Sequence, residues 1–389
     1  MSATRAAPKH AVWPALLAIA AVAGFCYLFL RSDRQWEIAG LSIGAAVALV
    51  LLGRTSGPAM AAAAWNAHPR AMRGLSLLTA LLIIALFHDN HFALLMLATV
   101  LLYSLACLGL TIQFGYAGVV NFAGAAFFGI GGYTAAVLAS HTGLSHLLVI
   151  VIGGVLAGVV GSLLVLPLLR TRGHYAALIT VAFAILFRTF LEVNDLLGGP
   201  QGLKVPGLEV LGWSFNSNLE LGANVEVSFY VSYTIFSLAL LVLALLLVRR
   251  LERSWIGLSL DAVRLDETAA AAFGFDVARW KILAFTLGNV LAGVAGAVYA
   301  MMTGFVAPAS FTLSESLILV SIVILGGVGN PLGVLLAAAL VVMLPEKLQA
   351  IQEYRFLLFS AFVILVLLFR PEGLLPRPLR DYLPGWKRA

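Results

Sequence analysis

The side chains of this chain that could do chemistry are few, and the densest group of them lies between residues 251 and 280. Charged and apolar residues alternate there through Arg264, Asp266 and Glu267, an alanine run follows, and Gly274 comes after it. The pattern predicts a short amphipathic helix and then an alanine-rich helix that stops at Gly274, because glycine readily adopts the left-handed conformation at a helix end. A segment of this kind can lie on a bilayer surface or dock into a groove on a soluble partner.

A second polar group, His88-Asp89-Asn90-His91, brings two imidazoles and a carboxylate into one short loop. Such side chains can bind a metal ion, but a solvated turn explains the same residues, and we expect no metal site. The chain also contains no His-Glu-x-x-His motif and no Gly-x-x-x-x-Gly-Lys-Ser/Thr motif. We therefore expect no catalytic site and no cofactor, and any ATP that powers the protein must bind to another subunit.

The composition indicates the solvent in which the chain folds. Of its 389 residues, 61% are hydrophobic and only 11% are charged, and the mean hydropathy is +1.01. A typical soluble domain is about 45–50% apolar and about 25% charged. Because so few charges cannot cover so much apolar surface in water, most of the chain must have lipid as its solvent. This excludes a soluble enzyme, a disulfide scaffold and a dedicated nucleic-acid-binding module, and Cys26 and Cys107 are read as small buried hydrophobes within apolar runs.

The apolar runs predict an all-α polytopic membrane protein with about ten to twelve transmembrane helices, some of them short or broken. A span needs roughly 20 mainly apolar residues, and these runs are continuous rather than alternating, which favours helices over barrel strands. The predicted segments are 12–30, 38–53, 74–87, 92–111, 121–140, 145–169, 174–192, 229–248, 281–301, 314–326, 331–344 and 356–369.

Basic residues indicate how the helices are oriented. The chain has 24 Lys and Arg against 18 Asp and Glu, a formal net charge of +6. With twelve crossings, most basic clusters fall on one side, and cytoplasmic loops are enriched in Lys and Arg. We therefore predict cytoplasmic termini and an external loop at 193–228, where Lys204 is the only basic residue. Arg31 and Arg34 do not follow this rule, so the orientation of the first hairpin stays open.

A short stretch of sequence occurs twice. Residues 155–161 reappear with one change as residues 290–296, an offset of 135. In the predicted topology the two copies run in opposite directions, which is the pattern of an inverted-topology repeat in transporters. The alternative is chance recurrence, since small residues recur wherever helices pack closely.

Two glycine-rich breaks interrupt the apolar pattern, at 115–121 and at 326–331. Glycine permits positive φ and close backbone approach, and broken helices at membrane depth are tolerated only where they are buried in protein or line a cavity. A pair of breaks in the two halves of a chain points to a translocation path. Tight helix packing together with an ordinary turn is the alternative.

The segment 251–280 resembles the coupling loop of a known class of transporter. Glu267-x-Ala269-Ala270 followed by Gly274 is similar to the Glu-Ala-Ala…Gly loop of ABC importer permeases. The wider run from Ser254 to Lys281 resembles the LivM-type permeases of high-affinity branched-chain amino acid importers. Further similar blocks follow in the same order over about 100–375: Gly115-Tyr116-Ala117-Gly118, Ala125-Ala126-Phe127-Phe128-Gly129-Ile130-Gly131, Arg172-Gly173-His174-Tyr175, Gly198-Gly199-Pro200-Gln201-Gly202, Gly304-Phe305-Val306-Ala307-Pro308, Leu325-Gly326-Gly327-Val328-Gly329 and Arg370-Pro371-Glu372-Gly373-Leu374. Asn121 and His174 depart from the family pattern, which usually has Ser and an acidic residue at these positions.

The resemblance implies a half-transporter in the cell inner membrane rather than an enzyme. Residues 76–375 would form the permease domain, preceded by an N-terminal extension with two extra spans at 1–75 and followed by a cytoplasmic tail at 376–389. The expected partners are a homologous LivH-type permease, two cytoplasmic ATPase subunits of the LivG/LivF type, and an extracytoplasmic solute-binding protein. The implied coupling residues are Arg264, Asp266, Glu267, Ala269, Ala270 and Gly274. The suggested substrate-path residues are Tyr116, Asn121, Tyr133, Gly326 and Gly327.

Two other functions remain open at this point. Permeases of urea and short-chain amide importers share most of these sequence blocks, so the substrate is less certain than the transport class. A stand-alone secondary transporter would ordinarily need ionisable residues inside its spans, and the predicted spans offer almost none. Arg188 and Glu192, four residues apart near a helix end, are expected to form a structural pair at the membrane interface.

Overall fold

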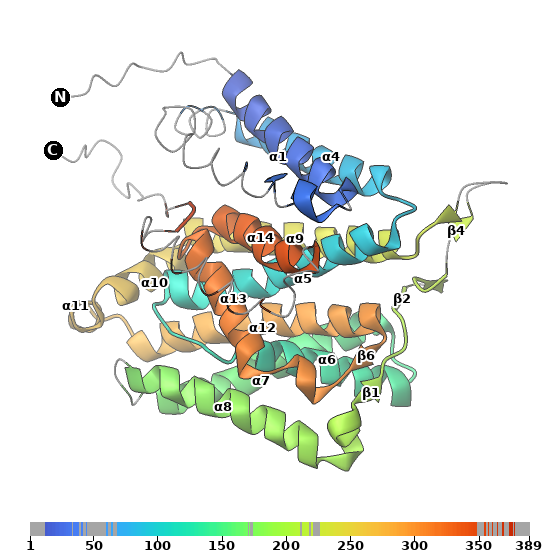
Figure 1. Cartoon of the computed structure of the whole chain (residues 1–389). Helices are drawn as coiled ribbons and strands as arrows, with labels where there is room; N and C mark the ends of the chain where they lie inside the picture. Colours follow the sequence, from blue (N-terminus) through green and yellow to red (C-terminus); the bar gives the residue numbers. More distant parts are fainter. Residues whose placement is uncertain are drawn as a thin grey trace, which may run out of the picture.

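The computed structural model describes residues 12–32, 34–38, 68–169, 174–210, 212–217 and 226–347, together with positions 40, 41, 44, 60, 64, 171, 219, 220, 354, 357, 360, 364, 368, 373–375 and 377. Its long helices run side by side across Figure 1 as a bundle. The helices α10 (Trp255–Leu265) and α11 (Glu267–Ala272) lie at one end of the bundle, and short β-strands lie at the other. We call these two ends the α10–α11 end and the strand end.

The described elements agree closely with the predicted segments. The other helices are α1 (Trp13–Arg31), α4 (Pro69–Leu86), α5 (His91–Thr111), η1 (Ile112–Tyr116), α6 (Gly124–His141), α7 (His146–Leu169), α8 (His174–Val193), η2 (Asp195–Leu197), η3 (Gly199–Gln201), α9 (Tyr230–Arg253), α12 (Val277–Thr303), η4 (Pro308–Ser310), α13 (Leu313–Gly326) and α14 (Pro331–Lys347). The strands are β1 (Leu203–Lys204), β2 (Glu209–Val210), β3 (Trp213–Ser214), β4 (Leu219–Glu220), β5 (Glu226–Val227) and β6 (Phe305–Val306). Each predicted segment corresponds to one of these helices except 38–53 and 356–369, of which the structure describes only isolated positions.

Two helices begin earlier than their apolar runs. The helix α4 begins at Pro69 rather than at residue 74, and α12 begins at Val277 rather than at residue 281. Proline suits the first turn of a helix because its missing N–H would have no partner there. The Asp276 carboxylate caps α12 by accepting a hydrogen bond from the Arg279 backbone nitrogen at 3.1 Å. Hydropathy detects only the apolar part of each helix and therefore misses these polar first turns.

The helices are long and apolar enough for a multi-pass membrane protein. Seven of the described helical segments have the length and hydropathy of a membrane span: Trp13–Arg31, His91–Tyr116, His146–Leu169, Tyr175–Val193, Tyr230–Arg253, Val277–Thr303 and Pro308–Gly326. The paired strands of the described residues are each only two residues long. The prediction of an all-α polytopic membrane fold is confirmed.

The centre of the bundle is α12, which packs against α5, α6 and α7. Glycines allow these helices to approach backbone to backbone. A Cβ atom at Gly131 of α6 would collide with the carbonyl group of Gly293 in α12, and a Cβ atom at Gly296 would collide with the carbonyl group of Phe128. Small residues of this kind permit close helix crossings in a membrane, where packing rather than apolar burial drives association.

The two copies of the repeated sequence lie in α7 and α12 and pack against each other. A Cβ atom at Gly158 would meet the Val290 side chain, and one at Gly154 would meet the Val294 side chain. Gly154 comes before Gly158 in α7, but its partner Val294 comes after Val290 in α12. The two copies therefore run antiparallel, in the opposite directions that the topology predicts. The small residues that the two copies share allow α7 and α12 to pack closely. That the two halves of the chain form an inverted repeat stays a prediction.

The helix α1 is attached to α14. The side chain of Lys347, at the end of α14, is buried and donates hydrogen bonds to the carbonyl oxygens of Leu30 at 2.8 Å and Ser32 at 3.1 Å. These carbonyls lie at the C-terminal end of α1, where a cation is electrostatically favourable. Phe29, Leu30 and Met343 belong to one buried apolar cluster at the same place. The helix α1 is thus attached to the body of the bundle.

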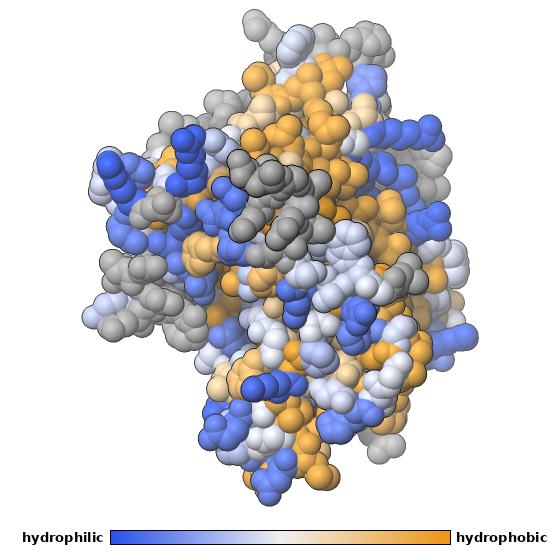
Figure 2. All heavy atoms as spheres, turned by 90° about the vertical axis from the view of Figure 1, so that its right-hand side faces the viewer, coloured by the Kyte–Doolittle hydropathy of each residue, from blue (hydrophilic) through white to orange (hydrophobic). Residues whose placement is uncertain are grey.

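The strand end joins distant loops. The strand β1 pairs antiparallel with β6, so that the loop after α8 is held against the turn that follows α12. Figure 2 looks onto this end of the molecule, where hydrophilic residues are spread between hydrophobic patches. This mixed surface contrasts with the apolar residues along the spans and is suited to the aqueous edge of a membrane protein.

Candidate functional site

The predicted coupling loop forms two short helices separated by a sharp turn. Asp266 caps α11, because its Oδ1 atom accepts hydrogen bonds from the backbone nitrogens of Thr268 at 2.8 Å and Ala269 at 3.0 Å. Gly274 ends the loop with a φ of +84°, in the left-handed region that glycine favours. The prediction of a short helix, an alanine-rich helix and a glycine stop is confirmed.

One face of this loop is buried in the protein and another is exposed. Leu260 and Val263 of α10 are fully buried against the bundle. In contrast, Leu265 and Phe273 are 85% and 84% exposed, and the Trp255 side chain is also largely exposed. Large apolar side chains at the tip of a polar loop are typical of a surface that contacts another molecule.

The predicted coupling residues occupy different positions on this loop. Ala270 is buried, whereas Ala269 and Gly274 are exposed. The Glu267 carboxylate pairs with the Lys281 ammonium group at 2.6 Å, but its side chain is 58% exposed. An exposed ion pair of this kind adds at most about 1 kcal/mol to stability. The Glu267 carboxylate therefore lies at the surface of the loop while paired with Lys281.

The loop is joined to the first glycine-rich break through the backbone of Gly115. The last turn of the span that begins with α5 is the π-helix η1, which ends at Tyr116. Its Gly115 carbonyl oxygen accepts hydrogen bonds from Arg264 Nη1 at 2.7 Å and from Arg377 Nη1 at 3.0 Å. Gly118, with a φ of +67°, lies against the Arg264 side chain. The predicted coupling residue Arg264 thus contacts the predicted break directly.

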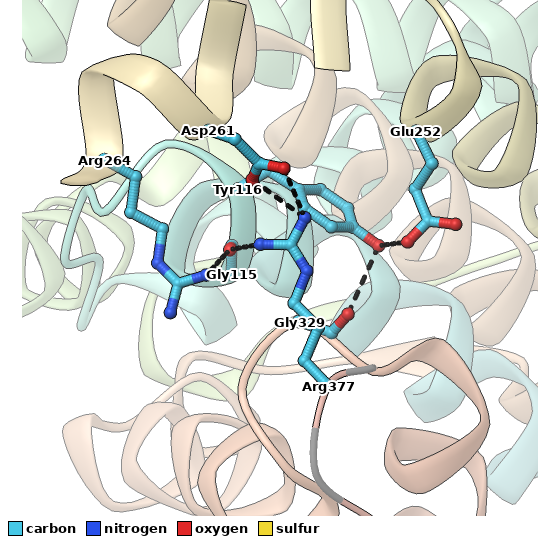
Figure 3. Close-up of polar contacts among 7 residues, drawn as sticks. All are labelled: Gly115, Tyr116, Glu252, Asp261, Arg264, Gly329 and Arg377. Carbon is cyan, nitrogen blue, oxygen red and sulfur yellow. Dashed lines mark hydrogen bonds and ion pairs between the residues drawn. The ribbon is translucent and has the colours of Figure 1, made fainter. Parts of the chain in front are cut away.

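A second set of contacts closes the cluster around Tyr116 (Figure 3). The Nη2 atom of Arg377 lies 2.8 and 3.0 Å from the two Asp261 carboxylate oxygens. The Tyr116 hydroxyl donates to Glu252 Oε1 at 2.6 Å and lies 3.4 Å from the Gly329 carbonyl oxygen. We call the residues Gly115, Tyr116, Glu252, Asp261, Arg264, Gly329 and Arg377 the junction.

The junction joins four separate parts of the chain. They are the end of the α5 span, the α9–α10 segment, the turn between α13 and α14, and the C-terminal segment at Arg377. Burial lowers the pKa of Arg264, and the neighbouring positive charge of Arg377 lowers it further. Two guanidinium groups share one carbonyl oxygen here, and the Asp261 and Glu252 carboxylates provide the opposing charge.

The second glycine-rich break is the turn between α13 and α14. Gly327 and Gly329 have φ values of +106° and +90°. A Cβ atom at Gly115 would collide with Gly329, so the two predicted breaks contact each other at the α10–α11 end. Gly326 packs against Gly333, and its carbonyl oxygen accepts a hydrogen bond from the Leu375 backbone nitrogen at 3.2 Å.

The other two path residues lie deeper in the bundle. Asn121 is buried in a network of amides, in which its Nδ2 atom donates to Gln113 Oε1 at 2.8 Å and to Asn289 Oδ1 at 3.2 Å. Gln113 Nε2 also donates to Asn289 Oδ1 at 2.9 Å. Tyr133 is buried in α6, with its ring 5.8 Å from that of Phe311. The structure therefore brings Tyr116, Gly326 and Gly327 to one end and places Asn121 and Tyr133 elsewhere.

Several residues of these clusters were not identified from the sequence. Gln113 and Asn289 carried a signal, since each is a polar amide inside an apolar span, and such residues are costly unless they have partners. Glu252, Asp261 and Arg377 carried none that distinguishes them from other charged residues in the polar segments between the apolar runs. Their partners are distant in sequence: Arg377 lies 116 positions from Asp261 and 262 positions from Gly115.

The remaining polar motifs have structural partners. Arg188 pairs with Glu192 at 2.8 Å along α8, which confirms the predicted pair. In the 88–91 motif, the His91 Nδ1 atom lies 2.7 Å from the Ser228 hydroxyl, and the His88 Nδ1 atom lies 3.1 Å from the Ala85 carbonyl oxygen. Among the described residues, no group of three or more His, Cys, Asp or Glu side chains could hold a metal ion.

The chain matches known proteins over most of its length. Residues 92–369 match the family described as the permease component of the branched-chain amino acid transport system. The high-affinity branched-chain amino acid transport system permease protein LivM of Escherichia coli K12 is 36% identical over 290 residues, which cover 71% of this chain and 68% of LivM. A probable LivM of Methanocaldococcus jannaschii is 26% identical, covering 71% of this chain and 90% of that protein. The E. coli permease LivH is 24% identical, with coverage of 71% and 92%. No solved structure matches the chain.

Proposed function

Because this chain belongs to the family of branched-chain amino acid transport permease components, we propose that it is one membrane-spanning half of an ATP-driven importer of branched-chain amino acids. It pairs with a LivH-type permease. This is supported by its similarity to both LivM and LivH proteins. Two cytoplasmic ATPases of the LivG/LivF type supply the energy, and an extracytoplasmic binding protein delivers the substrate. The protein lies in the cell inner membrane with both termini in the cytoplasm.

The observation that carries this proposal is the attachment of the coupling loop to the broken helix. The helices α10 and α11 expose Leu265, Phe273 and the Glu267 carboxylate at the end of the bundle. Behind that surface, Arg264 donates to the backbone of Gly115 at 2.7 Å. A movement of the exposed surface therefore reaches the end of the α5 span through the Arg264 side chain.

This geometry supports a sequence of mechanical steps. The ATPases bind the exposed face of α10 and α11 and move it when they close on ATP. Because Arg264 and Arg377 both hold the Gly115 carbonyl oxygen, the α5 span moves with the loop. The turn at Gly329 touches the same place, so α13 and α14 follow. Substrate access then passes from the strand end to the α10–α11 end. The chain hydrolyses no ATP itself.

The proposal is tested with the assembled importer in proteoliposomes. This chain is combined with its LivH-type partner, the two ATPases and the binding protein, and uptake of radiolabelled leucine is measured with and without ATP. We expect uptake that needs ATP, and we expect Glu267→Arg to abolish it by repelling the ATPase surface. Glu209→Arg, an exposed carboxylate of β2 at the strand end, is the matched control and should leave uptake unchanged.

Two outcomes would contradict the proposal. If no P-loop ATPase co-purifies with the chain and Glu267→Arg leaves uptake intact, the chain is not part of an ATP-driven importer and a stand-alone transporter is the better explanation. If the binding protein of the system binds urea but not leucine, isoleucine or valine, the substrate class is that of the related urea importers.

A further inference from the structure

The helices α4 and α9 pack against each other and bring two arginines together at the α10–α11 end. Arg73 lies about one turn after the start of α4, and Arg249 lies one turn before the end of α9. The two positive charges are close enough to act on each other. Farther along the helices, Ile84 of α4 and Leu238 of α9 belong to one buried apolar cluster. The two helices therefore run antiparallel, and their packing fixes the position of both arginines.

The Arg73 side chain is partly buried rather than extended into water. Its Nε atom is buried and has no hydrogen-bond partner in the part of the chain that the structure describes. Arginines near the end of a membrane helix usually keep the charged group in water, and Arg70 and Arg250 on the same two helices are exposed. A buried polar group without an acceptor is costly. The position of Arg73 thus favours an acceptor that comes from outside the chain.

Positive charge is in excess around Arg249. The guanidinium groups of Arg73 and Arg253 act on it unfavourably, and the Glu252 carboxylate acts on it favourably. Three cations and one carboxylate leave this group positively charged. The sequence contains no Asp or Glu at 38–88, so the chain around α4 supplies no further carboxylate from that stretch. An anion from outside this group would balance its charge.

Exposed leucines lie one turn deeper than the two arginines. Leu77 follows Arg73 by four positions on the same face of α4, and Leu246 precedes Arg249 by three positions on the same face of α9. The side chains of Leu77 and Leu246 are 39% and 47% exposed. Other leucines of these two helices are also exposed: Leu78, Leu81, Leu82, Leu243 and Leu247. Two cations at the end of the spans, with apolar surface directly beyond them, match the order of groups in a phospholipid.

We propose that Arg73 and Arg249 bind the phosphate group of an anionic membrane lipid, whose acyl chains lie along Leu77 and Leu246. Guanidinium groups suit this role because they bind phosphate oxygens in a bidentate manner. Basic sites between membrane helices are known to bind lipid headgroups. A free phosphate would satisfy the same arginines but would leave the leucines without a partner. The bound lipid adds an attachment between α4 and α9 at the α10–α11 end.

The first test measures lipid binding by the purified full-length chain in detergent. Phosphatidylglycerol is titrated, and bound lipid is counted by native mass spectrometry. We expect the double variant Arg73→Gln, Arg249→Gln to bind about thirtyfold more weakly, because each arginine near an anionic lipid contributes about fivefold. The matched control is the double variant Arg70→Gln, Arg250→Gln, which removes two exposed arginines from the same helices and should bind almost as tightly as the parent.

The second test measures thermal unfolding of the same proteins and shows whether the variants are folded. Without added lipid, the Arg73→Gln, Arg249→Gln variant should unfold at or above the parental midpoint, because two neighbouring like charges have been removed. Phosphatidylglycerol should raise the midpoint of the parent but not that of this variant, since a ligand stabilises the folded state that binds it. Zwitterionic phosphatidylcholine and inorganic phosphate should leave the parental midpoint unchanged.

The third test locates the lipid. A photoreactive benzoylphenylalanine replaces Leu77, and the chain is placed in phosphatidylcholine liposomes that contain a minor share of phosphatidylglycerol. After illumination, the lipid adducts are identified by mass spectrometry. Phosphatidylglycerol should be enriched about fivefold over its share of the bilayer. The same replacement at Leu163, an exposed leucine of α7, should yield the two lipids in the proportion of the bilayer.

Four outcomes would overturn the proposal. The first is unchanged phosphatidylglycerol affinity in the Arg73→Gln, Arg249→Gln variant. The second is an equal loss in the Arg70→Gln, Arg250→Gln variant, since binding would then follow surface charge alone. The third is stabilisation of the parent by inorganic phosphate, which would indicate a site for a free anion. The fourth is loss of association with the LivH-type permease at unchanged lipid affinity, which would assign the two arginines to an acidic surface of that partner. None of these outcomes bears on the proposed transport function.

Discussion

The guanidinium carbon of Arg377 lies 4.5 Å from the centre of the Tyr116 ring. The same side chain bonds to Asp261 of α10 and to the Gly115 carbonyl oxygen, so a residue from the C-terminal segment connects the coupling loop to the broken helix. The side chains of Arg377 and Asp261 are only 16% and 12% exposed. Because the arginine binds a carboxylate, a carbonyl oxygen and an aromatic face at once, a lysine cannot replace it.

We therefore expect Arg377→Ala and Arg377→Lys to uncouple the importer. Leucine uptake per ATP hydrolysed should fall by about tenfold, within the usual range of energetic coupling between two sites. ATP hydrolysis should continue, since the exposed face of α10 and α11 is unchanged. The measurement compares radiolabelled uptake with phosphate release in the same proteoliposomes. Arg279→Ala removes an exposed arginine near the same loop and is the control; an equal loss there would show a general effect of charge.

The close crossing of α6 and α12 gives a prediction about folding. A Cβ atom at Gly296 would collide with the backbone of Phe128, whereas one at Gly74 of α4 would meet no atom within 4 Å. Gly296→Ala should therefore destabilise the protein by about 1–3 kcal/mol through overpacking. Gly74→Ala should leave stability unchanged or raise it by up to about 1 kcal/mol, because alanine favours a helix. The measurement is thermal unfolding of the two purified variants. Equal midpoints would refute the close crossing of α6 and α12.

The buried amides also make a stability prediction. Asn289→Ala removes the oxygen that accepts hydrogen bonds from both Gln113 and Asn121. Leaving buried donors without partners costs about 1–3 kcal/mol, so the variant should unfold at a lower temperature than the parent. Gln201→Ala, at an exposed amide in η3, should change stability by no more than about 0.5 kcal/mol. A parent-like midpoint for Asn289→Ala would show that the network adds nothing.

The attachment of α1 can be tested by hydrogen exchange. Lys347→Met keeps an apolar stem of similar length but removes the ammonium group that holds the Leu30 and Ser32 carbonyl oxygens. The last amides of α1 should exchange at least about tenfold faster, since hydrogen bonds to a charged group are lost. Arg31→Met removes a charge from the same helix end, where Arg31 contacts the hydroxyl and the ring of the half-buried Tyr27, and should have a smaller effect. Equal effects would mean that Lys347 does not hold α1.

Features set by neighbouring residues could be predicted from the sequence. The alanine run, the capping Asp266 and the stop at Gly274 lie within nine residues of one another, so their pattern determines the local structure. Continuous apolar runs similarly identified the helices, because each span satisfies its own backbone hydrogen bonds. The glycine-rich breaks were found for the same reason, since positive φ at Gly118 and Gly327 depends on the residue itself.

The contacts between these elements could not be predicted in this way. Asp261 and Arg377 look like ordinary charged residues in polar segments, and only the fold places them 2.8 Å apart. A cavity lined by α5, α12, α13 and α14 likewise depends on helices that are distant in sequence. Polarity within apolar spans would have identified Gln113 and Asn289, but not the fact that they bind each other.

The bond between Lys347 and α1 also constrains the order in which the chain is assembled during synthesis. The lysine is 317 positions later in the sequence than Leu30, whose carbonyl oxygen it binds. The helix α1 is therefore synthesised long before the Lys347 ammonium group that binds the carbonyl oxygens at its C-terminal end. Until then the C-terminal end of α1 must be satisfied by water or lipid headgroups at the membrane surface, and the extension can reach its final place only after α14 has been inserted.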